Sequence, residues 1–420
     1  MDRISDLPTH IIEKILGSLP MADAVRTSIL STKWRQKWEE APQLVFDRSF
    51  VSYLQKRRGP MSDSDLMTMI LSEVLVVHSG SVNKFVLSIP QLESCPEIDR
   101  IIRVLAKRGV HDFKLSILSE GFHKLPSHLF AYNQLRSLKL YSCVVETPPG
   151  FGGFNKLATL EFQKVVVDPD FFEAFIAKCP QLERLVLRGC ICESPCVINL
   201  NAPNLKFFNY SGEYASICFK DTPLLEGASV YNPAGEHPQN GASKMKMRYL
   251  DEVLSGLHSI QSLSIDNYFL KTIIVRDTSR KLPNGLNQLK VLEAFDLCLT
   301  DEAEFSCLLG LIRSCPNLEE LRIEMIPAED FETSPSLPQI NADGIPVFML
   351  NKLRKVNFHG FGGTSFEMEL IKFLLSKLSG LRIMYVQPPA GMEDREQLKL
   401  VKRIVRFQRA SPNAEIIYGD

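Results

Sequence analysis

Apolar residues recur at helical spacing near the start of the chain, from position 7 to position 38. The first run predicts a helix that begins near Pro8, where a missing N–H is harmless, and that ends before Pro20. Its apolar positions are Leu7, Ile11, Ile12, Ile15, Leu16 and Leu19. Such a short helix cannot hide this much apolar surface within itself.

Two further helical runs follow in the same stretch. The second is centred on Ala24, Val25, Ile29 and Leu30. The third carries Trp34 and Trp38, which are four residues apart and so lie on one helical face. Because small units bury a low fraction of their surface, the surplus of apolar side chains predicts a partner surface.

The pattern then changes to a polar and charged stretch at residues 55–64, which predicts an exposed loop or linker. Its basic triplet, Lys56-Arg57-Arg58, is interpreted as part of a solvated loop rather than as a nuclear-import or phosphate-binding patch. An apolar-rich segment from Leu66 to Val77 predicts the helix that opens the next domain.

A short repeat dominates the chain from Val82 onward: a leucine-like residue, two variable residues, a second leucine-like residue, one variable residue and a third. The copies are Val82, Phe85 and Leu87; Val110, Phe113 and Leu115; Leu135, Leu138 and Leu140; Leu157, Leu160 and Phe162; Leu182, Leu185 and Leu187; Leu205, Phe208 and Tyr210; Ile260, Leu263 and Ile265; Leu318, Leu321 and Ile323; Leu353, Val356 and Phe358. Leu225 with Val230 and Leu289 with Leu292 are degenerate copies.

The alternation within each copy predicts a short strand with one buried face, whose backbone is satisfied only by neighbouring strands. The copies therefore predict an irregular solenoid with parallel strands on its concave side. Amphipathic runs at 171–177 and 305–312 supply helices for the convex side, and polar stretches at 232–243 and 327–346 predict surface loops. Amphipathic helices are expected at 366–378 and 397–407, separated by a strand at 381–386.

The N-terminal residues resemble a plant F-box. The matching positions are Ile4-Ser5-Asp6-Leu7-Pro8, Ile11-Ile12, Ile15-Leu16, Ala24, Arg26-Thr27-Ser28, Leu30-Ser31, Lys33-Trp34-Arg35 and Trp38. The resemblance implies docking on a Skp1-type adaptor, which links an F-box to a cullin ubiquitin ligase. Carried over by position, the adaptor-facing residues are Leu7, Pro8, Ile11, Ile12, Ile15, Leu16, Leu30 and Trp34. The alternative is that these residues form an ordinary helical core.

Two further resemblances lie in the repeats and at the C-terminal end. Cys179-Pro180-Gln181-Leu182 and Cys315-Pro316-Asn317-Leu318 resemble the Cys-Pro-x-Leu form of plant leucine-rich repeats. Gly360-Phe361-Gly362-Gly363 and Arg409-Ala410-Ser411, with the helices between them, are similar to the FBD domain of many plant F-box repeat proteins.

The predicted fold class is therefore α/β, in a plant F-box/FBD/LRR-repeat protein. A three-helix F-box is expected at residues 1–48, a linker at 49–65 and leucine-rich repeats at 66–345. An FBD domain is expected at 346–420, continuing the solenoid and capping its open end.

Composition narrows the class of protein. With 45% hydrophobic and 23% charged residues and a net charge of −1, the chain is expected to be globular and to bind neither nucleic acid nor an anionic membrane. Its apolar runs are too short for a membrane helix, so we expect a cytoplasmic or nuclear protein, or one found in both compartments. Ten cysteines are scattered, and the group Cys190, Cys192 and Cys196 lacks the paired spacing of a zinc site, which predicts free thiols.

No catalytic motif rises above background, so a non-catalytic protein without a cofactor or metal is expected. The glycine-rich segments Gly150-Phe151-Gly152-Gly153 and Gly360-Phe361-Gly362-Gly363 lack a lysine placed for phosphate and are interpreted as turns. His123 and His128 have no acidic partner at a useful spacing in the sequence and are interpreted as ordinary histidines.

A protein-binding surface is better supported, because residues that alternate with the buried leucines face the concave side. That surface is predicted to include Lys139, Tyr141, Glu161, Gln163, Arg188, Arg322, Glu324 and His359. Its mixed charges favour a protein partner or a small polar ligand. The resemblance implies the substrate-recognition subunit of a Skp1–cullin–F-box (SCF) ubiquitin ligase; the alternatives are a non-degradative scaffold and a receptor for a hormone-like small molecule.

Overall fold

The computed structural model describes residues 7–19, 21–27, 34, 37–89, 93–117, 121–168, 170–192, 196–233, 248–249, 253, 256–271, 273–274, 286–299, 302–326 and 350–419. Of the polar loop predicted at 232–243, only Asn232 and Pro233 lie in the described part, and the loop predicted at 327–346 lies wholly outside it. The chain divides into two compact units, residues 1–194 and 195–420. We describe each unit by itself.

The N-terminal module of unit 1 contains α1 (Thr9–Ser18), α2 (Met21–Arg26) and the 3₁₀ helix η2 (Lys37–Glu40). Pro8 directly precedes α1, and its carbonyl accepts hydrogen bonds from the amides of Ile11 (2.9 Å) and Ile12 (3.2 Å). The predicted first helix is thus confirmed. Of the predicted third helix, the described residues show Trp34 in a turn and Trp38 within η2.

The predicted exposed loop at residues 55–64 is wrong in its first half. Strand β1 (Gln43–Asp47) is followed at once by helix α3 (Arg48–Arg58). The Asp47 carboxylate accepts from the amides of Ser49 (2.9 Å) and Phe50 (3.2 Å), an N-cap that starts the helix. Phe50 and Leu54 are buried, so packing stabilises α3 although its last turn is strongly charged.

The domain boundaries proposed from the sequence stay predictions.

The helix predicted at 66–77 is confirmed, with an earlier start. It consists of α4 (Asp63–Met69), capped by the Ser62 hydroxyl at 3.2 Å from the Asp65 amide, and the π-helical segment η3 (Ile70–Leu75). The apolar side chains Leu66, Met67 and Ile70 are buried in the core of unit 1.

The predicted repeat strands of unit 1 are confirmed as one parallel sheet. After β1, its strands in order are β2 (Lys84–Ser88), β3 (Asp112–Ser116), β5 (Ser137–Tyr141), β7 (Thr159–Gln163) and β9 (Arg184–Arg188). The register aligns the second leucine-like positions as Phe85, Phe113, Leu138, Leu160 and Leu185. Each of these side chains is at most 1% exposed, because every repeat stacks its apolar face on its neighbours.

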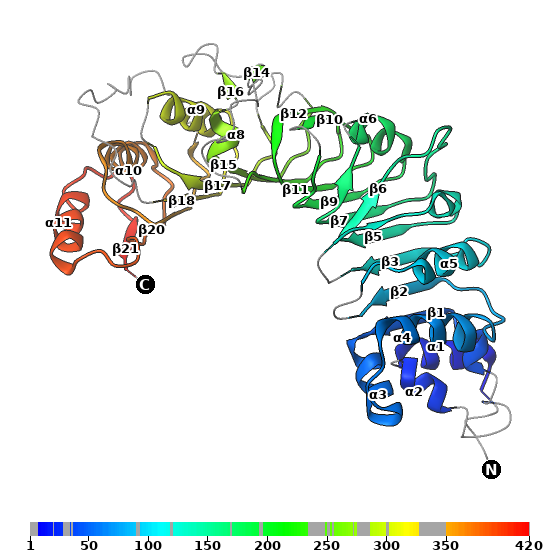
Figure 1. The fold of residues 1–420 in the computed structure, drawn as a ribbon. Coiled ribbons are helices and arrows are strands. Elements are labelled where there is room, and N and C mark those ends of the chain that lie inside the picture. Colours follow the sequence, from blue (N-terminus) through cyan, green and yellow to red (C-terminus); the bar gives the residue numbers. More distant parts are fainter. Residues whose placement is uncertain are drawn as a thin grey trace. The chain divides into compact units, whose positions relative to one another are not determined.

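Helices and turns cover one face of this sheet (Figure 1). Strand residues that alternate with the buried ones lie on the other face, which we call the open face. The covering elements include α5 (Pro96–Leu105), η4 (Ser127–Ala131), α6 (Phe171–Ala174) and η5 (Ile176–Lys178). The helix predicted at 171–177 is thus confirmed as two short segments. A second small sheet is formed by β4 (His123–Lys124), β6 (Cys143–Val145) and β8 (Val166–Val167).

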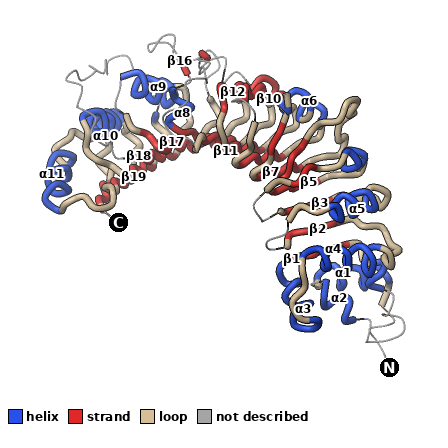
Figure 2. Tube along the Cα trace, viewed as in Figure 1, coloured by secondary structure: helices blue, strands red, loops and turns tan. Residues whose placement is uncertain are grey.

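Unit 2 repeats the same plan, with a row of parallel strands that Figure 2 shows in red. The strands in order are β11 (Phe207–Ser211), β13 (Gly227–Tyr231), β15 (Ser262–Asp266), β17 (Val291–Leu297), β18 (Glu320–Met325), β19 (Lys355–His359), β20 (Ile383–Val386) and β21 (Glu415–Tyr418). Two separate two-stranded sheets pair β10 (Cys196–Asn201) with β12 (Tyr214–Asp221) and β14 (Arg248–Tyr249) with β16 (Ile273–Ile274). Among its described helices are α8 (Asn267–Lys271), α9 (Glu302–Arg313), α10 (Ser365–Lys377) and α11 (Asp394–Ile404).

The C-terminal residues continue the repeat sheet of unit 2. Strand β19 pairs with β20, and β20 pairs with β21, all in parallel. The predicted helices appear as α10, which opens with a capping box between Thr364 and Glu367, and α11. That this region acts as a cap remains a prediction.

Candidate interaction surfaces

The N-terminal helices bury part of the predicted adaptor-facing set. Ile12, Leu16 and Trp34 are 4%, 3% and 1% exposed and pack with Ala24 in one cluster. Leu7 and Ile15 are half-buried against the same cluster. Pro8 is exposed and Ile11 half-buried, whereas Leu30 lies outside the described residues. Among the described residues of this set, Leu7, Pro8, Ile11 and Ile15 keep apolar surface that a partner can reach.

A hydrogen-bonded junction ties the N-terminal module to the first repeats. The carbonyl of Glu39, in η2, accepts from the amides of Ser79 (2.9 Å) and Gly80 (3.3 Å). A Cβ on Gly80 would lie 2.9 Å from the backbone of Glu40, so only glycine allows this approach. The strand pair β1–β2 follows directly.

Arg108 closes the junction from the next repeat. Its guanidinium donates to the carbonyls of Leu75, His78 and Gly80, which would otherwise be left unpaired where η3 ends. His78 is 1% exposed, and burial is the main reason that its pKa is lowered. The module and the repeats of unit 1 are thus one packed body.

The open face of unit 1 contains Lys139, Tyr141, Glu161, Gln163 and Arg188, which were predicted from the sequence to share it. They alternate with buried residues on β5, β7 and β9. Lys139 Nζ lies 2.7 Å from Glu161 Oε2, and this hydrogen bond lowers the pKa of Glu161. Lys164 lies over the Tyr141 ring, 6.0 Å from its centroid.

The remaining predicted residues, Arg322, Glu324 and His359, are exposed on strands β18 and β19 of unit 2. Arg322 donates from Nε to Glu320 at 2.8 Å and also pairs with Glu293. The bond from Arg322 is the main cause of the lowered pKa of Glu320. The imidazole of His359 lies 2.7 Å from the Gln387 side-chain oxygen.

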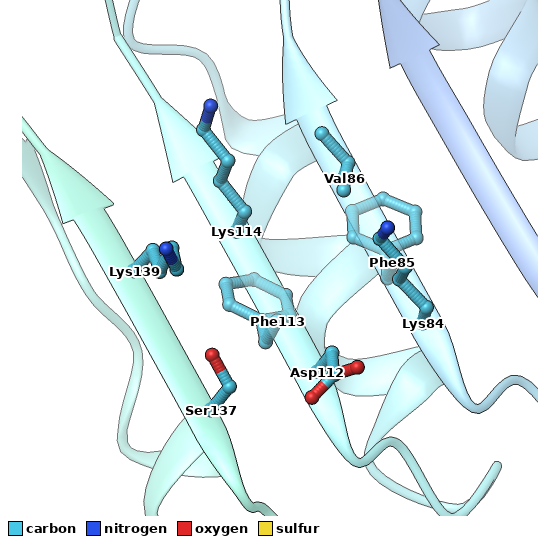
Figure 3. A pocket seen from close by; sticks show the side chains of 8 residues that line it. All are labelled: Lys84, Phe85, Val86, Asp112, Phe113, Lys114, Ser137 and Lys139. Atoms are coloured by element: carbon cyan, nitrogen blue, oxygen red, sulfur yellow. The ribbon is translucent and has the colours of Figure 1, made fainter. Parts of the chain in front are cut away.

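A hollow on the open face of unit 1 was missed by the sequence interpretation, apart from Lys139. It has a volume of about 400 Å³ and is lined by residues of β2, β3 and β5, among them Lys84, Lys114 and Lys139 (Figure 3). The sequence signal was present, because Lys84 and Lys114 flank the buried Phe85 and Phe113 of the repeat. We call this feature the lysine hollow.

His123 has an acidic partner after all, which corrects the sequence interpretation. Its Nε2 lies 3.1 Å from Asp99 of α5 and its Nδ1 lies 2.9 Å from the Ser94 hydroxyl. A Ser–His–Asp catalytic chain uses Nε2 toward the serine and a buried aspartate, whereas here the nitrogens are exchanged and the Asp99 side chain is 43% exposed. We interpret His123, which is 3% exposed, as a tie between β4 and α5; His128 is exposed in η4.

The other candidate sites gain no chemistry from the structure. The nine cysteines whose side chains are described are free, and the described residues hold no cluster of metal-ligating side chains. A Cβ added to Gly153 would lie 2.0 Å from the carbonyl oxygen of Lys178, and one added to Gly360 would lie 2.1 Å from the carbonyl oxygen of Met325. Both glycines therefore serve close backbone packing, as expected for turns between repeats. Within the described part, no helix has the length and apolar character needed to cross a bilayer.

The chain matches two models of known protein families. The F-box domain model matches residues 4–42, and the model described as "FBD-associated F-box protein At5g56370, LRR repeats" matches residues 98–323. Neither model describes an enzyme. The fold and these matches define an F-box protein whose N-terminal domain is followed by leucine-rich repeats.

Full-length relatives are similar to the chain throughout. F-box/FBD/LRR-repeat protein At1g13570 of Arabidopsis thaliana is 32% identical over 99% of this chain and 98% of its own length. From the same organism, FBD-associated F-box protein At5g56370 is 23% identical over both whole chains, and F-box/FBD/LRR-repeat protein At5g22660 is 25% identical over 99% and 96%. The chain belongs to the F-box/FBD/LRR-repeat proteins.

Proposed function

We propose that the protein is the substrate-recognition subunit of a Skp1–cullin–F-box ubiquitin ligase. The observation that carries this proposal is the F-box match at residues 4–42 on a chain whose repeats form an open sheet. An F-box implies a Skp1-type adaptor, and through it a cullin. The open faces are the surfaces on which we place the target protein.

In this mechanism the chain brings the target close to the ubiquitin-charged enzyme and makes or breaks no covalent bond itself. Docking the N-terminal helices on the adaptor while the repeats hold a target raises the effective concentration of a target lysine near the ubiquitin-charged enzyme. The packed junction at His78 and Arg108 supports this, because a fixed link transmits position better than a flexible one. We also propose that the protein works in the cytoplasm or the nucleus, where free thiols such as its described cysteines stay reduced.

The adaptor contact is tested by co-purification of the full chain with a plant Skp1-type protein. Ile11→Asp should abolish the complex, because it puts an unpaired charge into an apolar interface. Ile11 is the sharpest probe, since it is half-buried but lies outside the cluster around Trp34. Glu13→Lys is the matched control, because Glu13 lies two residues after Ile11 and so on the opposite side of α1. This variant also changes the charge of the helix but should keep the complex.

Retention of the complex by a folded Ile11→Asp variant would remove α1 from the interface. Failure of the wild type to bind any plant Skp1-type adaptor would overturn the proposal. Degradation is tested separately, because a target whose level does not rise when the proteasome is inhibited would identify a scaffold instead.

A further inference from the structure

The lysine hollow collects cations from three neighbouring strands on the open face of unit 1. Lys84 extends from β2, Lys114 from β3 and Lys139 from β5, with Val86, Asp112 and Ser137 completing the accessible lining (Figure 3). The rings of Phe85 and Phe113 lie beneath, each 1% exposed and stacked with centroids 5.7 Å apart. These rings pack on the buried side of the strands, so the hollow lies over a rigidly packed stretch of strand backbone and has a charged rim.

The positive charge of the rim is only partly balanced within the protein. Three lysines and one aspartate line the hollow, which leaves a net charge of +2 (3 − 1). Lys139 is paired with Glu161, but Lys84 and Lys114 make no ion pair among the described residues. The register places Lys84 beside Asp112 but Lys114 directly beside Lys139, and like charges in that relationship are destabilising. A bound anion would remove this repulsion.

The open face of unit 2 shows the opposite arrangement. Arg322 is held by Glu293 and Glu320, and Lys355 Nζ lies 3.3 Å from Glu320. Arg322 and Lys355 are therefore already neutralised, unlike Lys84 and Lys114 at the hollow.

The spacing of the lysines fits the carboxylates of an extended peptide. The register places Lys114 beside Lys139, whereas Lys84 lies two residues away from Lys114 along the neighbouring strand. Neighbouring strands lie about 4.8 Å apart and residues two apart on a strand about 7 Å, so the Cα atoms of Lys84 and Lys114 are roughly 8 Å apart, close to the spacing of about 7 Å between alternate side chains of an extended peptide. A nucleic acid is less suitable, because its affinity comes from many phosphate contacts and Asp112 and Glu161 would oppose it.

We propose that the lysine hollow binds an acidic segment, rich in glutamate and aspartate, of the target protein. This inference rests on the proposed function, in that it names the chemistry by which the repeats would recognise a target. The lysines supply the attraction and set the register of the bound segment.

The test measures binding of the full chain to a short fluorescent peptide of alternating glutamate and serine by fluorescence anisotropy. The wild type should bind this peptide, ignore a glutamine–serine counterpart and lose affinity as salt is raised. Lys84→Glu combined with Lys114→Glu should weaken binding about tenfold or more, because attraction becomes repulsion. If that variant melts early, Lys84→Gln with Lys114→Gln gives the same test with a smaller loss.

Lys399→Glu combined with Lys402→Glu is the matched control, because it changes the net charge equally at exposed positions of α11. It should leave peptide binding unchanged. Equal losses in both double variants, equal binding of the neutral peptide, or tighter binding of a single-stranded oligonucleotide would each overturn the inference.

Adaptor co-purification separates this inference from the proposed function. A wild type that binds the adaptor but not the acidic peptide overturns the role of the hollow alone. One that binds the peptide but no adaptor overturns the ligase role and leaves the hollow as an acidic-segment site.

Discussion

His78 Nε2 lies 2.8 Å from the carbonyl oxygen of Ala41 and donates a hydrogen bond to it. Ala41 directly follows η2 of the N-terminal module, whereas His78 lies three residues after the end of η3. Because His78 is 1% exposed, water does not compete for this bond. The contact joins the F-box to the first repeats, so the N-terminal helices keep a fixed position relative to the lysine hollow in the same unit.

The stability of this junction is expected to fall in mild acid. Burial, with the nearby Arg108 charge, lowers the pKa of His78 below its ordinary 6.5, although the hydrogen bond to Ala41 and the charge of Glu39 act in the opposite direction. A lowered folded-state pKa means that the unfolded chain binds the proton first. The contribution of neutral His78 is therefore complete above pH 6.5 and is lost as the pH falls through the folded-state pKa.

Urea unfolding from neutral pH to mild acid checks this expectation. His78→Gln keeps a donor for the Ala41 carbonyl but cannot titrate, so its stability should depend less on pH than that of the wild type. Parallel curves for the two proteins would show that His78 does not control the acid sensitivity. His123, whose pKa burial also lowers, contributes in the same direction and remains in both proteins.

Arg108→Ala should destabilise the protein by about 2 kcal/mol, because several carbonyls around η3 would lose a charged donor. The exposed Arg103→Ala, on the neighbouring helix α5, is the matched control and should change the free energy of unfolding by at most about 0.5 kcal/mol. Equilibrium denaturation measures both. Equal effects would mean that the guanidinium contacts at the junction add nothing.

Trp34→Ala should cost about 3–5 kcal/mol, since it empties the centre of the cluster with Ile12, Leu16 and Ala24. Trp38→Ala should cost clearly less, because that side chain is only half-buried in η2. Thermal melting followed by circular dichroism compares the two. A small loss of stability would return Trp34 to the candidate adaptor-facing residues. A large loss would mean that a Trp34→Ala variant that fails to bind the adaptor does so because it no longer folds.

Two glycines with positive φ allow the cost of backbone strain to be measured apart from the cost of a steric clash. Gly360 has φ +70° and no room for a Cβ beside the Met325 carbonyl, whereas Gly391 has φ +88° and nothing within 4 Å. Gly391→Ala should therefore cost about 1 kcal/mol of backbone strain alone. Gly360→Ala should cost at least about 2 kcal/mol more, measured by urea unfolding, because β19 and β18 must also separate. Equal costs would mean that the backbone relaxes freely at Gly360.

The repeat strands and the first helix could be predicted from the sequence because their signals are local. Alternating positions such as Leu138 and Leu140 define a strand with one buried face wherever it stacks. Likewise, Pro8 and the apolar spacing to Leu16 define a helix. The prediction failed at α3, where the charged residues 56–58 suggested a loop. The cap at Asp47 and the burial of Phe50 decide that segment, and burial depends on distant neighbours.

The candidate surfaces depended more on tertiary structure. The apolar set around Leu7 was visible in the sequence, but only packing separates the buried Trp34 from the accessible Pro8. The tie between His123 and Asp99 spans 24 positions with no pattern to announce it.

The sequence by itself determined the F-box, the repeats and the alternation of buried and exposed strand positions, because helical and strand periodicity are properties of the chain. Only the tertiary structure decided which charges meet. The register between strands pairs Lys139 with Glu161 and leaves Lys84 and Lys114 at an open hollow, and that register is a relation between segments far apart in sequence.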